Sequence, residues 1–311
     1  MKTAAEGFSF SRLPIVPRLS DYAQLTKARV TTLIVITAWC GFFFGARGAG
    51  LPVLGWRLLH ALLGIALVSS GTAALNEVME HEIDGRMRRT ARRPIPSGRM
   101  SLLHATVVGV LLTIGGSIYL VVATNWLTGA LTFLTSLIYL AAYTPLKRIS
   151  PICTFVGAFP GAMPGVLGWT AARGRLDWAA LALFAILFLW QFPHFFAIAW
   201  MYREDYARGS IRMLPVVEPD GQSTSARIVL YSVALIPVSV VPTFLGMSGW
   251  IYLGGATLLG LAFLYFGARL SLLGLPVNDA RSRLRARQLF RWSIVYLPVL
   301  FALMMSNATR G

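Results

Sequence analysis

The sequence is poor in charged residues, in acids and in cysteine. Only 13% of its 311 residues are charged and 56% are hydrophobic, a composition that is unusual for a soluble domain. The two cysteines, Cys40 and Cys153, lie in apolar segments without metal-ligand spacing, so neither a disulfide framework nor a zinc site is expected. Residues 1–29 contain no short apolar run before a small-residue cleavage site, so no cleavable signal peptide is expected.

Long apolar segments recur along almost the whole chain. A helix of about 20 apolar residues is needed to cross a bilayer core. The segments therefore predict an all-α integral membrane protein in which residues 30–311 form a single domain of nine transmembrane helices. The predicted spans are 30–46, 58–79, 102–123, 126–143, 152–171, 178–201, 227–246, 249–268 and 289–306.

The positive charge of the chain predicts its orientation in the lipid bilayer. The net charge is +16, from 28 Lys and Arg against 12 Asp and Glu. If segment 1–29 is cytoplasmic, 23 of the 28 basic residues lie on the cytoplasmic side. The outer side receives only Arg47, Arg57, Arg173, Arg175 and Arg310. This is the positive-inside pattern of membrane proteins, so no nucleic-acid partner is expected.

Acidic residues gather in two predicted cytoplasmic loops, 80–101 and 202–226. At the start of the first, Asn76, Glu80 and Asp84 recur every four residues at the end of an apolar segment. On a helix this spacing places the three side chains along one stripe. Carboxylates near the lipid core are costly, so the stripe requires compensating cations.

Arginines follow the stripe at positions 86, 88, 89, 92 and 93. Mg²⁺ is usually held by one or two carboxylates, waters and substrate phosphates, and the arginine fork suits phosphate oxygens. The stripe extends over about 12 Å of helix, which suits two ions sharing a diphosphate better than one ion held by all three side chains. The pattern predicts a Mg²⁺–diphosphate site. The alternative is a solvated loop whose arginines only fix the topology.

Three further segments are candidates for parts of the same site. Asp205, in the second loop, could complete a metal site across a cavity, although the segment alone resembles an ordinary helix end. Lys147 and Arg148 are either a topology anchor or part of the phosphate pocket. His194 is either a hydrogen-bonded core histidine or a metal ligand or proton donor in the cavity.

The predicted helix 152–171 is rich in glycine and proline. Glycines at 157, 161 and 165 form a smooth strip, and prolines at 160 and 164 bend the helix. Such a strip lets another helix or a flat ligand approach closely. It is therefore either a helix-packing surface or one wall of a substrate cavity.

Six motifs occur in an order that is typical of one known family. They are Leu25-Thr-Lys-Ala-Arg29, Asn76-x3-Glu80-x3-Asp84 leading into Met87-x-Arg89-Thr90-x2-Arg93-Pro94, Tyr143-Thr-Pro-Leu-Lys-Arg148, Pro160-Gly-Ala-x-Pro164, Trp190-Gln-x-Pro-His-Phe195, and Asp205-Tyr206-x2-Gly209 through Met213. Together they resemble the UbiA-like intramembrane prenyltransferase superfamily, and within it the protoheme IX farnesyltransferases, or haem O synthases.

The chain departs from the pattern of this family at a few positions. Ala28 replaces a proline, Glu80 stands where many relatives carry Asp, and Ser210 replaces a common second glycine. Gly209 stands where quinone-directed relatives repeat an aspartate, which favours the haem branch.

The resemblance implies a nine-helix bundle and Mg²⁺-dependent transfer of a farnesyl group from farnesyl diphosphate to a vinyl group of haem B, with addition of water to give haem O. The implied catalytic residues are Asn76, Glu80, Asp84, Asp205 and Tyr143, of which the first four are also the implied Mg²⁺ ligands. The implied substrate-binding residues are Lys27, Arg89, Arg93, Lys147, Arg148, His194 and Tyr206.

The resemblance also implies a multi-pass protein of a bacterial-type plasma (inner) membrane, with its active site facing the cytoplasm. A haem O oxidase or a cytochrome oxidase assembly is the implied partner. Two other functions stay open. A prenyltransferase with a phenolic or quinone acceptor would use the same diphosphate site. A transporter also carries intramembrane acids, but no matched pair of broken helices is evident in the two halves of the sequence.

Overall fold

A computed structural model describes residues 17–309, except 219 and 273. The long helices of this part of the chain are α2 (Ala28–Arg47), α3 (Trp56–Arg86), α4 (Leu102–Ala123), α5 (Trp126–Leu137), α7 (Cys153–Arg173), α8 (Trp178–Met201), α11 (Gln222–Phe244), α12 (Trp250–Ser271) and α13 (Ala280–Ser306). The short ones are α1 (Leu19–Leu25), the π-helix η1 (Ile138–Tyr143), α6 (Thr144–Leu146), α9 (Arg203–Arg208) and α10 (Leu214–Val217). The prediction of an all-α fold is confirmed.

Eight spans within the described residues are long and apolar enough to cross a membrane. One of them, Trp126–Leu146, joins α5, η1 and α6 into a single continuous span. Helix α7 occupies the place of the remaining predicted span, but its glycines and prolines make it less apolar than the others. The chain is therefore a multi-pass integral membrane protein, with one less apolar helix inside its bundle.

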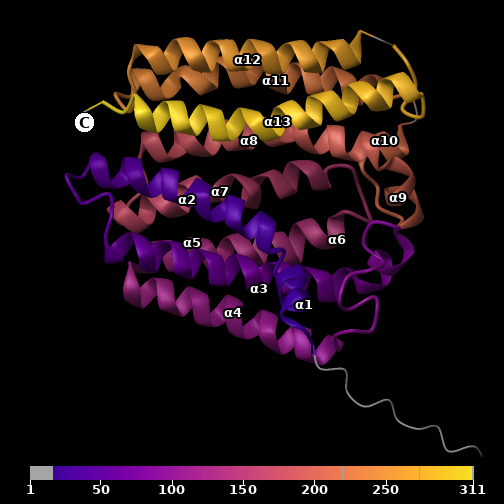
Figure 1. The fold of residues 1–311 in the computed structure, drawn as a ribbon, viewed down its shortest axis with the longest axis horizontal. Coiled ribbons are helices and arrows are strands. Elements are labelled where there is room, and N and C mark those ends of the chain that lie inside the picture. The colour runs from indigo at the N-terminus through magenta and orange to yellow at the C-terminus, as the bar shows by residue number, and fades with distance from the viewer. Residues whose placement is uncertain (1–16, 219, 273, 310–311) are drawn as a thin grey trace, which may run out of the picture.

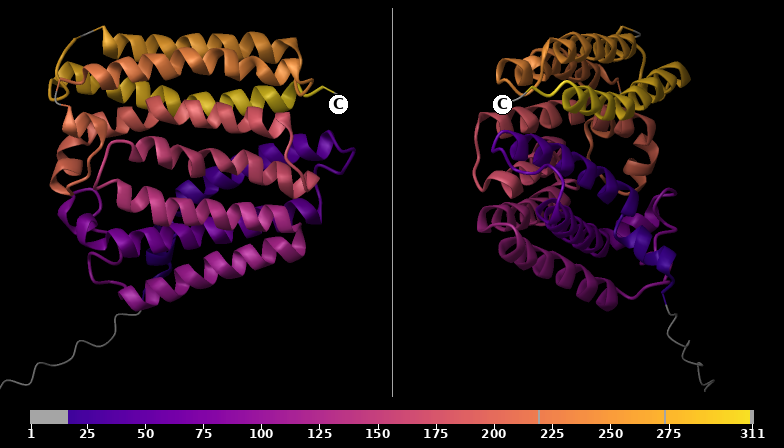
Figure 2. Two further views of the ribbon diagram at one scale, coloured as in Figure 1. Left: turned by 180° about the vertical axis from the view of Figure 1, so that it is seen from behind. Right: turned by 60° about the vertical axis from the view of Figure 1, so that its left-hand side comes forward.

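The long helices lie side by side with their ends at two opposite faces of the bundle (Figure 1). The views from behind and from the side show α2, α3, α4, α5 and α7 together on one side, and α8, α11, α12 and α13 on the other (Figure 2). Helices α7 and α8 pack against each other and connect the two groups.

Glycines of α7 allow close contact with α2. A Cβ atom at Gly168 would collide with the carbonyl oxygen of Ala38, and one at Gly41 would collide with the backbone of Gly165. Gly157 and Gly161 instead face the side chains of Tyr143 and Gln191. The helix-packing interpretation of the strip thus holds at Gly165, because small residues let two backbones approach.

The two ends of the bundle carry different side chains, and each end is named after its characteristic residues. The acidic end holds the last turns of α3, together with α6 and α9 (Figure 1). At the opposite end, four helices each begin with a tryptophan that is 70–77% exposed: Trp56, Trp126, Trp178 and Trp250. We call this the tryptophan end.

Two element boundaries differ most from the prediction. Helix α3 continues to Arg86, so the whole acidic stripe is helical, including the part predicted in loop 80–101, and the connection begins at Met87. Helix α13 begins at Ala280, nine residues before the predicted span, where the Asp279 side chain accepts a hydrogen bond from the Arg281 N–H (2.7 Å). Hydropathy detects only the apolar part of a helix, and both helices extend beyond that part.

Candidate active site

The acidic stripe of α3 is buried in the bundle. Asn76 is 1% exposed, Glu80 7% and Asp84 1%. Because α3 is regular through Arg86, the four-residue spacing does place these side chains along one face, as predicted. A buried carboxylate without a partner would cost several kcal/mol, so the partners of these acids define the site.

Each carboxylate of the stripe pairs with a cation from another segment. Lys147 Nζ lies 2.8 Å from Glu80 Oε1, and Arg93 Nη1 lies 2.5 Å from Asp84 Oδ2. Lys147 directly follows α6, whereas Arg93 belongs to the connection after α3. Two predicted phosphate-binding residues thus neutralise two predicted metal ligands.

Asn76 is held by Lys27 and Thr144. Lys27 Nζ donates a hydrogen bond to Asn76 Oδ1 (2.7 Å), and Asn76 Nδ2 donates one to Thr144 Oγ1 (3.1 Å). Lys27 has φ = 48°, a left-handed conformation that is uncommon for a non-glycine residue, between α1 and α2. Burial lowers the pKa of Lys27. The strained backbone therefore delivers an amine to the first residue of the stripe.

The second acidic segment meets the first through the connection after α3. Asp205, 9% exposed, pairs with Arg208 and accepts a hydrogen bond from the backbone N–H of Arg88 (3.3 Å). The guanidinium of Arg89 lies over the rings of Tyr202 and Tyr206, 5.5 and 5.8 Å from their centroids. The structure thus places Asp205, Arg89 and Tyr206 at the same end as the stripe.

Tyr143 and Lys147 form a further contact at this end. Lys147 Nζ lies 4.4 Å from the centroid of the Tyr143 ring, a cation–π geometry. The carbonyl oxygen of Lys147 accepts a hydrogen bond from the Arg212 N–H (2.8 Å). The segment after η1 is therefore fixed between the stripe and the second acidic segment.

Two predicted site residues lie apart from these contacts. His194 Nδ1 shares a hydrogen bond with Ser293 Oγ (2.7 Å), and its ring stacks on Trp190 with 4.7 Å between centroids. It thus faces α13 and makes no hydrogen bond to the carboxylates of the stripe within the described residues. Arg148 is exposed, and within the same residues it has no ion pair.

The sequence interpretation missed residues that hold the connection after α3. Glu77 is fully buried; its Oε1 accepts a hydrogen bond from the Ile95 N–H (3.4 Å), and its Oε2 has no partner within the described residues. Arg99 Nε lies 2.8 Å from Asp21 Oδ1 and so links the connection to α1. The hydrogen bond from Arg99 lowers the pKa of Asp21. The only sequence signal for Glu77 is its place beside Asn76.

The donor atoms of the acidic end fit Mg²⁺. Within the described residues, no group of three or more His, Cys, Asp and Glu side chains is close enough to hold a metal. Mg²⁺ does not need such a cage, because substrate phosphates and water complete its shell around one or two carboxylates. Glu80, Asp84 and Asp205 supply hard oxygen atoms, and the amide oxygen of Asn76 supplies a fourth.

Known sequences resemble this chain along its whole length. The model of the UbiA prenyltransferase family matches residues 34–295. A protoheme IX farnesyltransferase of Koribacter versatilis is 56% identical over 309 residues, which cover 99% of this chain and 100% of that protein. A protoheme IX farnesyltransferase of Solibacter usitatus is 50% identical, with 92% and 98% covered.

Solved structures share the fold. A digeranylgeranylglyceryl phosphate synthase has a TM-score of 0.75 at 17% identity, covering 93% of this chain and 98% of that one. A UbiA homologue from Archaeoglobus fulgidus bound to GPP and Mg²⁺ has a TM-score of 0.58 at 15% identity, covering 91% and 99%. With the sequence relatives, these matches establish that the chain is a prenyltransferase of the UbiA family, on its protoheme IX farnesyltransferase branch.

Proposed function

We propose that this enzyme transfers the farnesyl group of farnesyl diphosphate to a vinyl group of haem B, and that water adds to give haem O. The names of its relatives support the substrates. The observation that carries the proposal is the set of buried acid–cation pairs at the acidic end, Glu80 with Lys147 and Asp84 with Arg93. In each pair the carboxylate could bind the metal and the cation could bind the diphosphate.

The pairs would exchange partners when substrate binds. Glu80, Asp84, Asp205 and Asn76 would turn their oxygens to Mg²⁺, which when bound neutralises charge on the departing diphosphate. Lys147 and Arg93 would turn to the phosphate oxygens, together with Lys27 and Arg89. In the free enzyme, ion pairs with Lys147, Arg93 and Arg208 compensate the buried carboxylates of Glu80, Asp84 and Asp205.

The chain's own residues would support each stage of the transfer. When the bond between farnesyl C1 and oxygen breaks, its electron pair stays on the diphosphate, and preorganised cations favour that charge. The ring of Tyr143, beside Lys147, would face the allylic cation, and surrounding apolar side chains would exclude water. The cation then bonds to the terminal vinyl carbon of haem, and water captures the new cation with loss of a proton.

Tyr206 and His194 have separate proposed roles in substrate binding. Burial raises the pKa of Tyr206, so its hydroxyl stays protonated and can donate to a phosphate oxygen. His194 is our candidate for contact with haem. Ser293 holds its Nδ1, and its Nε2 makes no hydrogen bond within the described residues. That arrangement fixes the ring orientation while leaving one nitrogen for a ligand. Arg148, which is exposed, would bind substrate only from the rim.

The distribution of basic residues supports a cytoplasmic location for the acidic end. We propose that the protein lies in a bacterial inner membrane with its acidic end, and residues 1–29, in the cytoplasm, because most basic residues lie at that end. Residues 30–311 would act as one membrane domain. A haem O oxidase or a cytochrome oxidase assembly would receive the product.

Mass spectrometry of the haem product tests this proposal. Purified protein in detergent is given farnesyl diphosphate, Mg²⁺ and haem B, and wild type is compared with Asp84→Asn. Glu82→Gln is the matched control, since Glu82 is exposed on the same helix two residues away. We expect wild type and Glu82→Gln to form a haem that has gained one farnesyl unit and water, and Asp84→Asn to form almost none.

Other outcomes would contradict the proposal. Prenylation of a phenolic acceptor with no haem product would place the enzyme on the quinone branch. Inactivity of folded protein with every acceptor would reopen the transporter interpretation. Equal activity of Asp84→Asn and wild type would remove Asp84 from the site.

A further inference from the structure

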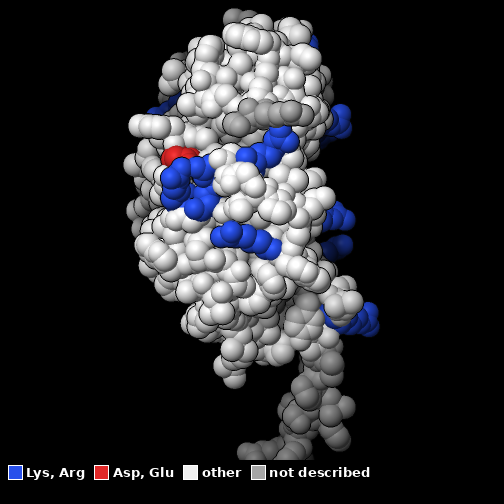
Figure 3. All heavy atoms as spheres, turned by 90° about the vertical axis from the view of Figure 1, so that its left-hand side faces the viewer, with Lys and Arg blue, Asp and Glu red and all other residues white. Residues whose placement is uncertain are grey.

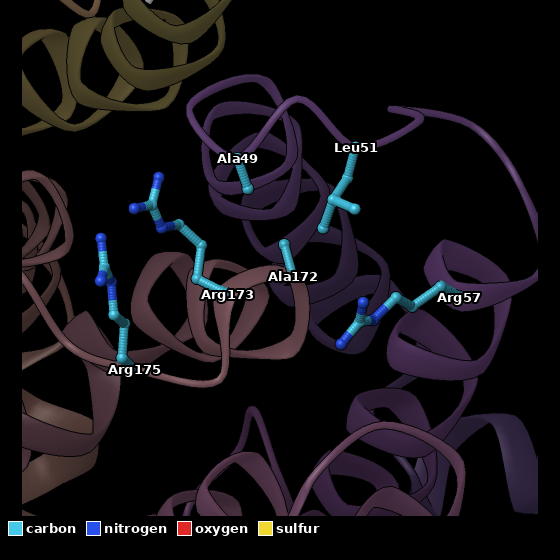
Figure 4. Close-up of a pocket in the computed structure, with 6 residues that line it drawn as sticks. All are labelled: Ala49, Leu51, Arg57, Ala172, Arg173 and Arg175. Atoms are coloured by element: carbon cyan, nitrogen blue, oxygen red, sulfur yellow. The ribbon is translucent and has the colours of Figure 1, made fainter.

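Three of the arginines predicted on the outer side of the membrane meet at one cavity at the tryptophan end. The cavity is a shallow hollow that is open to the surface, with a volume of about 380 Å³. Its lining residues are Ala49, Leu51, Arg57, Ala172, Arg173 and Arg175. Figure 4 shows the guanidinium groups of Arg173 and Arg175 side by side, with Arg57 across the small side chain of Ala172. We call this the arginine cavity.

The arginine cavity has more positive than negative charge. Asp177 Oδ2 lies 3.6 Å from Arg173 Nε and 3.8 Å from Arg175 Nε, so two cations share one carboxylate. Arg57 has no ion pair within the described residues. Figure 3, which faces this end, shows basic side chains gathered on a largely uncharged surface, with acidic atoms only at one edge of the group. An anion in the cavity would restore the balance.

One of these guanidinium groups is held in place before any ligand binds. The side chain of Arg173 is 14% exposed, and its guanidinium lies 5.6 Å from the centroid of the Trp169 ring. An arginine that is already ordered loses little side-chain entropy when it binds, and its planar fork matches phosphate oxygens. Arg175, at 66% exposed, can close over a ligand from the rim.

The arginine cavity lies at the level of the membrane surface. Arg57 directly follows Trp56, and Arg175 lies three residues before Trp178. Both tryptophans are exposed, at 77% and 74%, and tryptophan concentrates where lipid headgroups meet the hydrocarbon core. The phosphate groups of phospholipids lie at this same level of the membrane.

We propose that the arginine cavity binds the phosphate group of an anionic phospholipid. This site is separate from the diphosphate site, since Arg57 and Asp84 are 27 residues apart on α3, or about 40 Å along the helix. Free inorganic phosphate shares the chemistry of a lipid phosphate. The apolar Leu51 and the neighbouring tryptophans favour the lipid, because an acyl chain can lie against them.

Native mass spectrometry of the full chain in detergent micelles tests the proposal. The protein is titrated in parallel with phosphatidylglycerol, phosphatidylcholine and inorganic phosphate. The variant Arg57→Gln/Arg175→Gln removes two exposed charges and leaves the packed Arg173 in place. Under the positive-inside rule, loss of outer positive charge does not favour inversion of the protein. Arg287→Gln, an exposed arginine at the start of α13, controls for loss of charge elsewhere.

We expect wild type and Arg287→Gln to retain phosphatidylglycerol in preference to phosphatidylcholine. The double variant should bind phosphatidylglycerol about tenfold more weakly, since it lacks two of three charge-assisted contacts. Arg173→Lys, which keeps the charge but loses the fork, should also weaken binding. Equal phosphatidylglycerol binding by wild type and the double variant would overturn the proposal. Inorganic phosphate that competes at the same concentration as the lipid would overturn the assignment to a lipid.

Discussion

Arginines mark both ends of the bundle, but within the part of the chain that the structure describes only one end combines them with buried carboxylates. At the acidic end, Asp84 and Asp205 each pair with an arginine and Glu80 with a lysine. At the tryptophan end, Arg173 and Arg175 share Asp177 and lie near Arg57. Three arginines with a single carboxylate suit a simple anion such as a phosphate. Cations interleaved with carboxylates suit an anion that arrives with a divalent metal. The same residue type therefore serves two chemistries according to its neighbours.

Removal of the metal should produce the largest difference in effect between the acidic end and the tryptophan end. Chelation with EDTA should abolish farnesyl transfer, because Mg²⁺ would no longer offset the charge on the leaving group. Binding of phosphatidylglycerol at the arginine cavity should not change. Product formation and lipid retention, measured on the same preparation before and after chelation, check this. Transfer that persists in metal-free enzyme would contradict our account of the acidic end.

Two neighbouring acids of α9 should differ in their effects on activity. Asp205 is 9% exposed and contacts the connection after α3, whereas the side chain of Glu204 is 67% exposed and pairs with Arg283. We expect Asp205→Asn to lower kcat on the order of 10²-fold, the scale of losing one electrostatic group at a reaction centre. Glu204→Gln should keep wild-type kcat. Steady-state kinetics with saturating haem B measures both; a similar loss in the two variants would indicate a general effect on α9.

The pair of Lys147 and Glu80 should act as a unit. Each single change, Lys147→Gln or Glu80→Gln, leaves one buried charge without its partner and should raise KM for farnesyl diphosphate. The double variant should lose less than the product of the two single effects, with a coupling energy of about 1–3 kcal/mol. A double-mutant cycle on kcat/KM measures this coupling. Strict additivity would mean that the pair has no common role.

The smallest expected effect concerns the link between α1 and the connection after α3. The hydrogen bond from Arg99 lowers the pKa of Asp21 from its ordinary value of 3.8. A lowered pKa means that this contact stabilises the fold above pH 3.8 and that its contribution is lost as the pH falls toward the folded-state pKa. Asp21→Asn should therefore lower Tm slightly at neutral pH and not at strongly acidic pH. Thermal unfolding of both proteins across this range provides the test, and a difference in Tm that does not depend on pH would exclude the ionised contact.

Much of the fold follows from the sequence because lipid imposes a simple rule on helix length. Runs of apolar residues predicted the positions of the long helices, and the four-residue spacing of Asn76, Glu80 and Asp84 predicted that these side chains lie along one stripe of a helix. The predicted C-terminal end of α3 and the predicted N-terminal end of α13 were wrong. A helix continues past the lipid wherever its polar residues stay hydrogen-bonded. Hydropathy carries no information on that continuation.

The pairing of charges at the site could not be predicted. Lys147 meets Glu80 across 67 residues of sequence, and nothing local specifies which acid a given cation will reach. Lys27 reaches Asn76 from a backbone in the left-handed conformation, which the sequence does not indicate. The sequence also did not predict that His194 faces α13. Helix α8 is apolar on all sides, so its hydrophobic pattern does not show which face turns inward.

We propose above that the carboxylates of the acidic end exchange their cation partners for a metal when a diphosphate binds. Electron paramagnetic resonance of Mn²⁺, used in place of Mg²⁺, tests this directly in wild type, Asp84→Asn and the control Glu82→Gln with an unreactive thio analogue of farnesyl diphosphate. We predict tight Mn²⁺ binding in wild type and Glu82→Gln only when the analogue is present, and greatly weakened binding in Asp84→Asn. Mn²⁺ binding of equal strength in all three proteins would contradict the claim.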